Sequence, residues 1–133
     1  VALARALIMN PQVLLLDEPF AALDSQYRKF LTVKLEEIWQ KTKKTIIFVT
    51  HSVHESVLLA DEIYLLSARP TKIKKIYHVN LPRPRSLSDS KFVRLTRKIE
   101  VDLQEEFEKV VMNPLMESSL SNILKLSGKR GVL

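Results

Sequence analysis

Residues 13–24, with the sequence VLLLDEPFAALD, place the strongest constraint on the fold. Four apolar residues, Val13–Leu16, run directly into two acids, Asp17 and Glu18, and Pro19 ends the run. A short uninterrupted apolar run is typical of a strand buried on both faces of a parallel sheet. In such sheets, ligands bind beyond the carboxyl ends of the strands. The pattern therefore predicts an α/β fold with acidic chemistry at one strand end.

The following segments extend this prediction. Residues 45–50 (TIIFVT) and 62–67 (EIYLLS) form further apolar runs, and 73–79 alternates like an edge strand. Residues 25–41 repeat apolar side chains at helical spacing, which predicts an amphipathic helix. Asp24 or Ser25 is a suitable N-cap for it. Strands that alternate with helices predict parallel βαβ units. The ends of the first two strands should then lie close together.

Shorter signals mark the remaining elements. Ser52 and Glu55 fit a capping box that opens a short helix, and we expect Glu55 to serve only in that cap. Residues 81–86 (LPRPRS) contain two prolines, which predict a break and a domain boundary near residue 85. A long amphipathic helix is expected from about residue 88 to 112. Helical segments are also expected over residues 1–9 and, more weakly, after Asn113-Pro114.

Composition narrows the range of functions. The net charge is +6, and residues 41–98 hold 13 basic and 4 acidic side chains. Such an excess suits a surface that faces phosphate, lipid or nucleic acid. No aromatic ladder for base stacking accompanies it, so we favour an ordinary solvated surface and no nucleic-acid partner. The absence of cysteine excludes disulfides and thiolate metal sites.

The strand ends carry the residues of nucleotide chemistry. A hydrophobic strand that ends in Asp and Glu is a Walker B pattern, in which the Asp holds Mg²⁺ for a nucleoside triphosphate. The next carboxylate, Glu18, can orient or deprotonate the attacking water. His51 follows the second strand, where it can contact the γ-phosphate and help to hold that water. Asp17, Glu18 and His51 are therefore the candidate site residues.

Two stretches, VALARALIMNPQVLLLDEPFAALD and TIIFVTHSVHESVLLADEIYLLS, closely resemble the ATP-binding subunit of ABC transporters over residues 1–85. The resemblance implies the C-terminal part of a P-loop NTPase domain, with parallel strands and flanking helices, and a helical extension over 86–133. It assigns Asp17 to the Walker B aspartate, Glu18 to the catalytic glutamate and His51 to the switch histidine. Residues 21–24, which end in Asp24, match the D-loop that contacts the opposite subunit.

The segment LLSARPTKIKKIYHVNLPRPRS, with the basic helix that follows it, resembles the nitrate, sulfonate and taurine class of importer ATPases. Importers of riboflavin and pyrimidine precursors remain open. The resemblance implies ATP and Mg²⁺ as cofactors, and a head-to-tail dimer on the cytoplasmic face of the membrane. Its implied partners are a second ATPase subunit, two membrane permease subunits and, through them, a periplasmic or lipoprotein solute-binding protein.

Family motifs are also missing. The only glycines are Gly128 and Gly131, so the sequence holds no G-x-x-x-x-G-K-[ST] loop and no LSGGQ signature. We expect the sequence to begin just after the signature of a longer protein, and the 133 residues alone to be inactive. Two alternatives remain: a soluble ABC-type ATPase of DNA repair or translation, and a non-catalytic module that binds a partner through the helix at 88–112.

Overall fold

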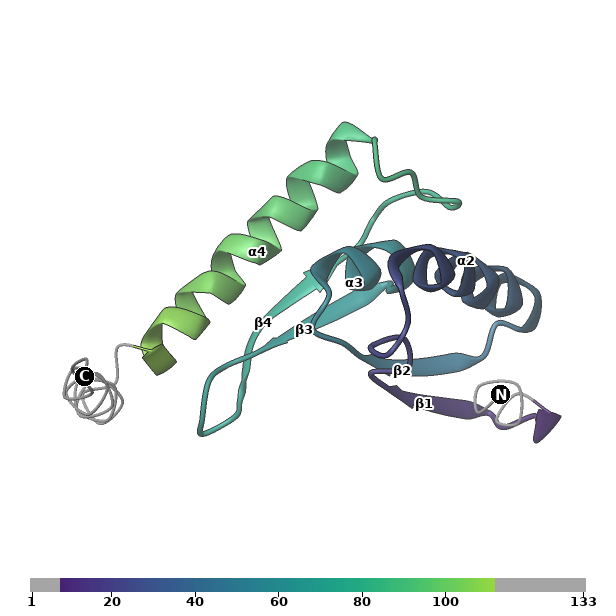
Figure 1. The fold of residues 1–133 in the computed structure, drawn as a ribbon, viewed down its shortest axis with the longest axis horizontal. Helices are drawn as coiled ribbons and strands as arrows, with labels where there is room; N and C mark the ends of the chain where they lie inside the picture. The colour runs from purple at the N-terminus through teal and green to yellow at the C-terminus, as the bar shows by residue number, and fades with distance from the viewer. Residues whose placement is uncertain (1–7, 112–133) are drawn as a thin grey trace, which may run out of the picture. The chain divides into compact units, whose positions relative to one another are not determined.

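The computed structural model describes residues 8–111, which form two compact units. Residues 8–63 and 78–96 make up the first unit, and residues 64–77 and 97–111 the second. Almost all of the helix expected over 1–9, and the segment after Asn113, lie outside the described residues. The elements in Figure 1 are β1 (Val13–Asp17), α2 (Ser25–Thr42), β2 (Thr45–Val49), α3 (Val53–Leu59), β3 (Glu62–Leu66), β4 (Ile73–His78) and α4 (Ser90–Val111).

Strands β1 and β2 form a parallel pair, as the sequence predicts, with helix α2 as the connection between them (Figure 1). Leu14 pairs with Ile46, and Asp17 at the end of β1 pairs with Val49 at the end of β2. This register brings both strand ends to one edge of the sheet. It therefore places the loop after β1 beside the loop after β2.

Helix α2 begins and ends at identifiable caps. The Asp24 carboxylate accepts the backbone N–H groups of Gln26 and Tyr27, at 3.0 and 3.1 Å. Lys43 takes a left-handed conformation at the other end, and its N–H donates to the Trp39 carbonyl. The two caps thereby satisfy two of the backbone N–H groups that open the helix and one carbonyl of its last turn.

The core of the first unit lies between α2 and one face of the β1–β2 pair. Phe20 and Leu35 are each only 2% exposed, and the Phe20 ring contacts the Phe48 ring at a centroid distance of 5.7 Å. The buried face of β1 contributes Leu14 and Leu16. Burial of these side chains stabilises the unit by about 1.5–3 kcal/mol for each large apolar residue.

The opposite face of the same strands is not covered by any described residue. Leu15 and Ile47, which pair across the strands, are 67% and 52% exposed, and Val13 and Val49 flank them with 54% and 45%. The prediction that β1 is buried on both faces is therefore wrong for the described part of the chain. The side chains of β1 are apolar on both faces of the strand, as that prediction requires. Helix α2, however, can cover only one of these faces.

Arginine side chains of the segment 79–89 hold the end of α3. Arg83 donates to the Leu59 carbonyl at 2.6 Å and lies 4.3 Å from the Trp39 ring centroid. Arg85 is almost completely buried. Its guanidinium donates to the carbonyls of Val57, Leu58, Ala60, Val79 and Leu81. The segment has no regular structure, as its prolines predict, but it is tightly packed.

Strands β3 and β4 form a separate two-stranded sheet. They are joined by the short turn at 67–72, which is long enough only for an antiparallel hairpin. The parallel βαβ arrangement is thus confirmed for β1 and β2 and does not extend to β3. The sequence showed four strand-like runs but not which of them pair. In the structure β3 pairs with β4, the next strand along the chain.

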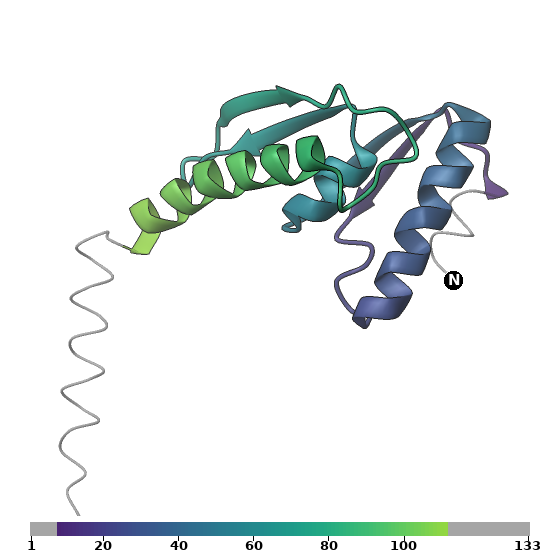
Figure 2. The same cartoon turned by 90° about the horizontal axis from the view of Figure 1, so that it is seen from above.

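Helix α4 lies alongside the hairpin in the second unit (Figure 2). The Asp102 carboxylate accepts hydrogen bonds from Tyr77 and Lys75 of β4. Glu106 accepts the Ala68 N–H at 3.1 Å, and its carboxylate pairs with Lys74 at 2.9 Å. Hydrogen bonds lower the pKa of Glu106 to about 2. The bond from Lys109 has the largest effect, followed by those from Lys74 and from the Ala68 N–H.

We expect the contact between α4 and the hairpin to weaken in acid. Glu106 has a lower pKa in the folded chain than its ordinary value of 4.5. Its contribution to the stability of the contact is therefore complete above pH 4.5 and is lost as the pH falls toward about 2. Amide hydrogen exchange of α4 across this range measures the loss. Glu106→Gln should reduce the pH dependence, whereas the exposed Glu108→Gln should not. Part of the dependence remains because the hydrogen bonds from Lys75 and Tyr77 also lower the pKa of Asp102. An unchanged profile in Glu106→Gln would contradict this assignment.

No helix within residues 8–111 is both long enough and apolar enough to cross a lipid bilayer.

Candidate functional site

Glu18 and His51 meet at the carboxyl ends of β1 and β2. The Nδ1 atom of His51 lies 2.9 Å from the Glu18 carboxylate, although 33 residues separate the two in the chain. Both side chains remain accessible, with 37% of Glu18 and 72% of His51 exposed. The expectation that these strand ends lie together is confirmed. A carboxylate paired with an imidazole on an open edge can exchange protons with a bound water.

The backbone of Glu18 is held in an unusual conformation. Its φ of 44° lies in the left-handed region, which costs a residue other than glycine about 1–3 kcal/mol. Its N–H donates to the Val49 carbonyl at 2.9 Å, so the strand pairing continues one residue beyond β1. The next turn is closed by the Ala21 N–H, which donates to the Glu18 carbonyl. These hydrogen bonds hold the carboxylate at the sheet edge.

Asp17 is the last residue of β1, and its side chain is exposed at the same edge. Among residues 8–111, no three carboxylate or imidazole side chains gather closely enough to enclose a metal ion. Mg²⁺ in nucleotide sites takes one or two carboxylates, waters and phosphate oxygens instead of a full protein cage. An exposed strand-end carboxylate with a second one beside it is compatible with that mode of binding.

Asp24 is engaged elsewhere. Its Oδ1 atom accepts the two N–H groups that open α2, so this oxygen serves as the helix N-cap. The structure therefore brings Glu18 and His51 together and gives Asp24 a structural contact. A capping role does not occupy the second carboxylate oxygen.

Glu55 is a residue whose surroundings the sequence did not reveal. Ser52 caps α3 by accepting the Glu55 N–H at 3.3 Å, which confirms one half of the expected capping box. The other half is wrong, because the Ser52 N–H donates to Thr50 and not to Glu55. The Glu55 carboxylate instead accepts a hydrogen bond from the Thr50 hydroxyl at 2.7 Å and faces Arg28 of α2 at 3.9 Å. The polar Thr50 before His51 is the one sequence feature that relates to this contact, and by itself it does not indicate Glu55 as the partner.

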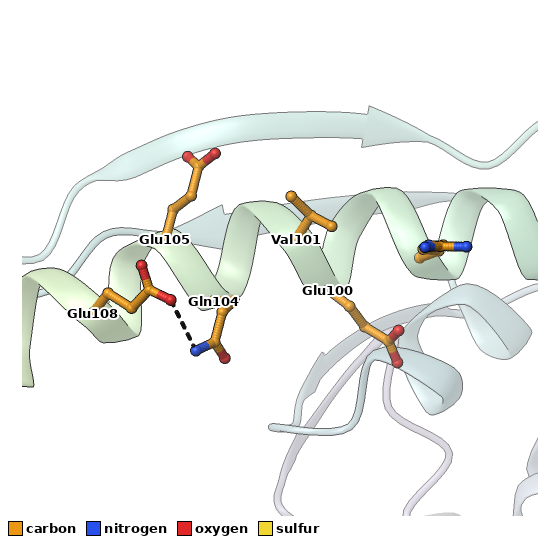
Figure 3. Close-up of a pocket in the computed structure, with 6 residues that line it drawn as sticks. Glu100, Val101, Gln104, Glu105 and Glu108 are labelled. Carbon is orange, nitrogen blue, oxygen red and sulfur yellow. Dashed lines mark hydrogen bonds between the residues drawn. The ribbon is translucent and has the colours of Figure 1, made fainter.

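A surface hollow lies along α4 (Figure 3). Every residue that lines it comes from successive turns of this one helix, and Gln104 donates to Glu108 across it at 3.2 Å. A hollow of this kind is the space between neighbouring side chains of an exposed helix. It lacks the convergent polar groups from several elements that a ligand site requires.

Comparison with known proteins identifies relatives for most of the chain. No family model matches it. An uncharacterized ABC transporter ATP-binding protein of Methanocaldococcus jannaschii is 49% identical over 106 residues, which is 80% of this chain. The aliphatic sulfonates import ATP-binding protein of Bacillus cereus is 48% identical over 74% of the chain. The nitrate import ATP-binding protein of Synechocystis is 40% identical over 75%.

The chain spans only about two fifths of the length of these relatives, at 40%, 39% and 38% respectively. Identity of 40–49% over 74–80% of the chain is nevertheless high, and it agrees with the resemblance carried by residues 1–85. The α/β structure with its parallel pair is compatible with part of such a protein. The matched residues of this chain therefore belong to the ABC transporter ATP-binding protein family.

Proposed function

We propose that this chain supplies the hydrolytic residues of the ATP-binding subunit of an ABC importer. The observation that supports this most strongly is the 2.9 Å contact between Glu18 and His51 at the ends of two adjacent parallel strands. Residues 1–85 would be the C-terminal portion of the ATPase domain, and 86–133 a helical extension. ATP would be the substrate of the reaction.

Glu18 is the residue proposed to accept a proton from the attacking water. Its carboxylate lies at the open sheet edge and is already hydrogen-bonded to His51, which orients it. His51 is 72% exposed, so its ring can reach a bound phosphate as well as Glu18. General-base assistance of this kind accelerates a reaction about 10²–10⁴-fold.

Asp17 is the residue proposed to hold Mg²⁺ beside the phosphates, most simply through a bound water. The ion would neutralise charge that develops on the phosphoryl oxygens. Residues 21–24 would form the D-loop and face a second ATPase subunit. Asp24 would thus contribute to the dimer through the shape of this loop, which its capping contact with α2 maintains.

The uncovered apolar face of β1 and β2 supports the proposal that further residues complete this domain. A strand whose both faces are apolar is stable when layers of helix cover both sides of its sheet. Leu15 and Ile47 lack one of these layers within residues 8–111. The P-loop and the LSGGQ signature, which these 133 residues do not contain, would come with the missing part of a subunit as long as the relatives.

The relatives named for sulfonate and nitrate import suggest a small anion or small organic solute as the cargo. The subunit would dimerise head to tail and act on two permease subunits, with a solute-binding protein outside the membrane. It would be bound peripherally to the cytoplasmic face of that membrane.

The proposal is tested on the complete reading frame that contains the Val1 codon. We expect it to encode a P-loop and an LSGGQ signature upstream, and its purified product to hydrolyse ATP in the presence of Mg²⁺. The 133-residue chain should bind ATP weakly at most, because most phosphate contacts are absent from it. A stop codon directly upstream, or tight Mg²⁺-dependent ATP binding by the short chain, would contradict the proposal and favour a non-catalytic module.

A further inference from the structure

A polar network connects the two loops of the proposed site behind the Glu18–His51 contact. Glu55 is its centre and is only 8% exposed. Its Oε2 atom accepts the Thr50 hydroxyl at 2.7 Å, and its Oε1 atom lies 3.9 Å from the Nε of Arg28. Thr50 also accepts the Ser52 N–H at 3.0 Å, which shapes the turn that carries His51.

Arg28 extends the network to the loop after β1. Its Nη2 atom donates to the Leu23 carbonyl at 3.1 Å and reaches the Ala21 carbonyl at 3.5 Å. Its Nε atom is buried and has no hydrogen-bond partner within the described residues, so the facing Glu55 carboxylate compensates the charge without a direct hydrogen bond. The buried carboxylate is Glu55, whose side chain is 10% exposed against 36% for Arg28, and without the facing guanidinium its charge would be costly.

We propose that Arg28 and Glu55 are positioning residues that fix the loop at 18–24 against the turn at 50–52. The kinetic consequence of this inference rests on the proposed ATP hydrolysis. The coupling of the two loops rests on geometry alone. The His51 side chain is 72% exposed and the Glu18 side chain 37%, and beyond their mutual contact the backbone hydrogen bonds of Glu18 hold the pair. The network holds the backbone on both sides of their contact, at Ala21–Leu23 and at Thr50.

The chemistry of the network separates a positioning role from simple stabilisation. Glu55→Gln keeps an oxygen that can accept the Thr50 hydroxyl but removes the charge that faces Arg28. Thr50→Val removes the hydroxyl and keeps the shape, whereas Thr50→Ser keeps the hydroxyl. A side chain that acts through the orientation of Glu18 and His51 should change kcat and leave the KM for ATP unchanged.

We expect Glu55→Gln and Thr50→Val to lower kcat of the complete protein about 10- to 100-fold, since small displacements of reacting groups have effects of this size. Thr50→Ser should restore most of the activity. The matched control is Glu37→Gln, which breaks the exposed ion pair between Glu37 and Lys34 on the same helix α2 and should leave both constants unchanged. Unchanged kcat in Glu55→Gln and Thr50→Val would overturn the kinetic role.

Hydrogen exchange provides a readout that does not depend on ATP hydrolysis. The Ala21 and Leu23 amides donate within their own turn, to the carbonyls of Glu18 and Phe20. In Glu55→Gln we expect these two amides to exchange about tenfold faster, with no change in Glu37→Gln. If they keep their protection, the two loops are not coupled through Glu55. If the coupling is present but the complete protein hydrolyses no ATP, the proposed function fails and the structural inference stands.

Discussion

Glu18→Gln should abolish ATP turnover by the complete protein and leave ATP binding intact. Gln keeps the size of the side chain and an oxygen near His51, but it cannot accept a proton from water. We expect kcat to fall by about 10²–10⁴-fold, the range that positioned proton transfer contributes. Steady-state phosphate release measures kcat, and titration with a fluorescent ATP analogue measures binding.

The chain offers a matched control for this experiment. Glu62 lies 3.2 Å from the Nδ1 of His78, so Glu62→Gln removes a second carboxylate–imidazole contact from the same unit. That pair involves the start of β3 and not the carboxyl ends of β1 and β2. We expect Glu62→Gln to retain wild-type turnover. Wild-type turnover in Glu18→Gln would instead show that Glu18 is not the general base.

Arg85→Met should cause the largest loss of stability among the substitutions considered. The Arg85 side chain is 2% exposed, and burial is the main cause that lowers its pKa. Methionine removes every donor to the five carbonyls that the guanidinium satisfies, including three at the end of α3. Buried carbonyls without a partner cost about 1–3 kcal/mol each, although water can reach some of them. We expect the free energy of unfolding to fall by about 3–5 kcal/mol.

Unfolding in urea, followed by tryptophan fluorescence, measures this loss. Trp39 is the only tryptophan of these 133 residues and lies against Arg83, in the same packed region. Because the complete protein can contain further tryptophans, comparison with the Trp39→Phe variant identifies the part of the fluorescence signal that comes from Trp39. Arg94→Met, at an exposed position of α4, is the control for the loss of a positive charge. A midpoint in Arg85→Met equal to that of Arg94→Met would show that the carbonyls find water instead.

The elements themselves were predictable from local patterns. The runs at 13–16 and 45–50 became β1 and β2 within a residue, and helical periodicity located α2 and the start of α4. Asp24 caps α2 as its type and position suggest. Such features depend on side chains only a few residues apart, so a single sequence contains the information.

The proximity of Glu18 and His51 was also predictable, and for a different reason. Each residue follows directly after an apolar strand, and parallel neighbours must align their carboxyl ends. The register of β1 and β2 then determines the contact. The same reasoning could not identify Glu55, because a glutamate three residues after a serine looks the same whether it caps a helix or faces an arginine on another helix.

The sequence by itself therefore determined the strands, the helices, the acidic and imidazole residues at the strand ends, and the family. Only the tertiary structure decided that Glu55 joins Thr50 to Arg28, that Arg85 closes the end of α3, and that β3 pairs with β4. The physical reason is distance along the chain. Periodicity and capping involve neighbouring residues, whereas a buried polar side chain takes its partner from whichever distant segment the packing brings within hydrogen-bonding range.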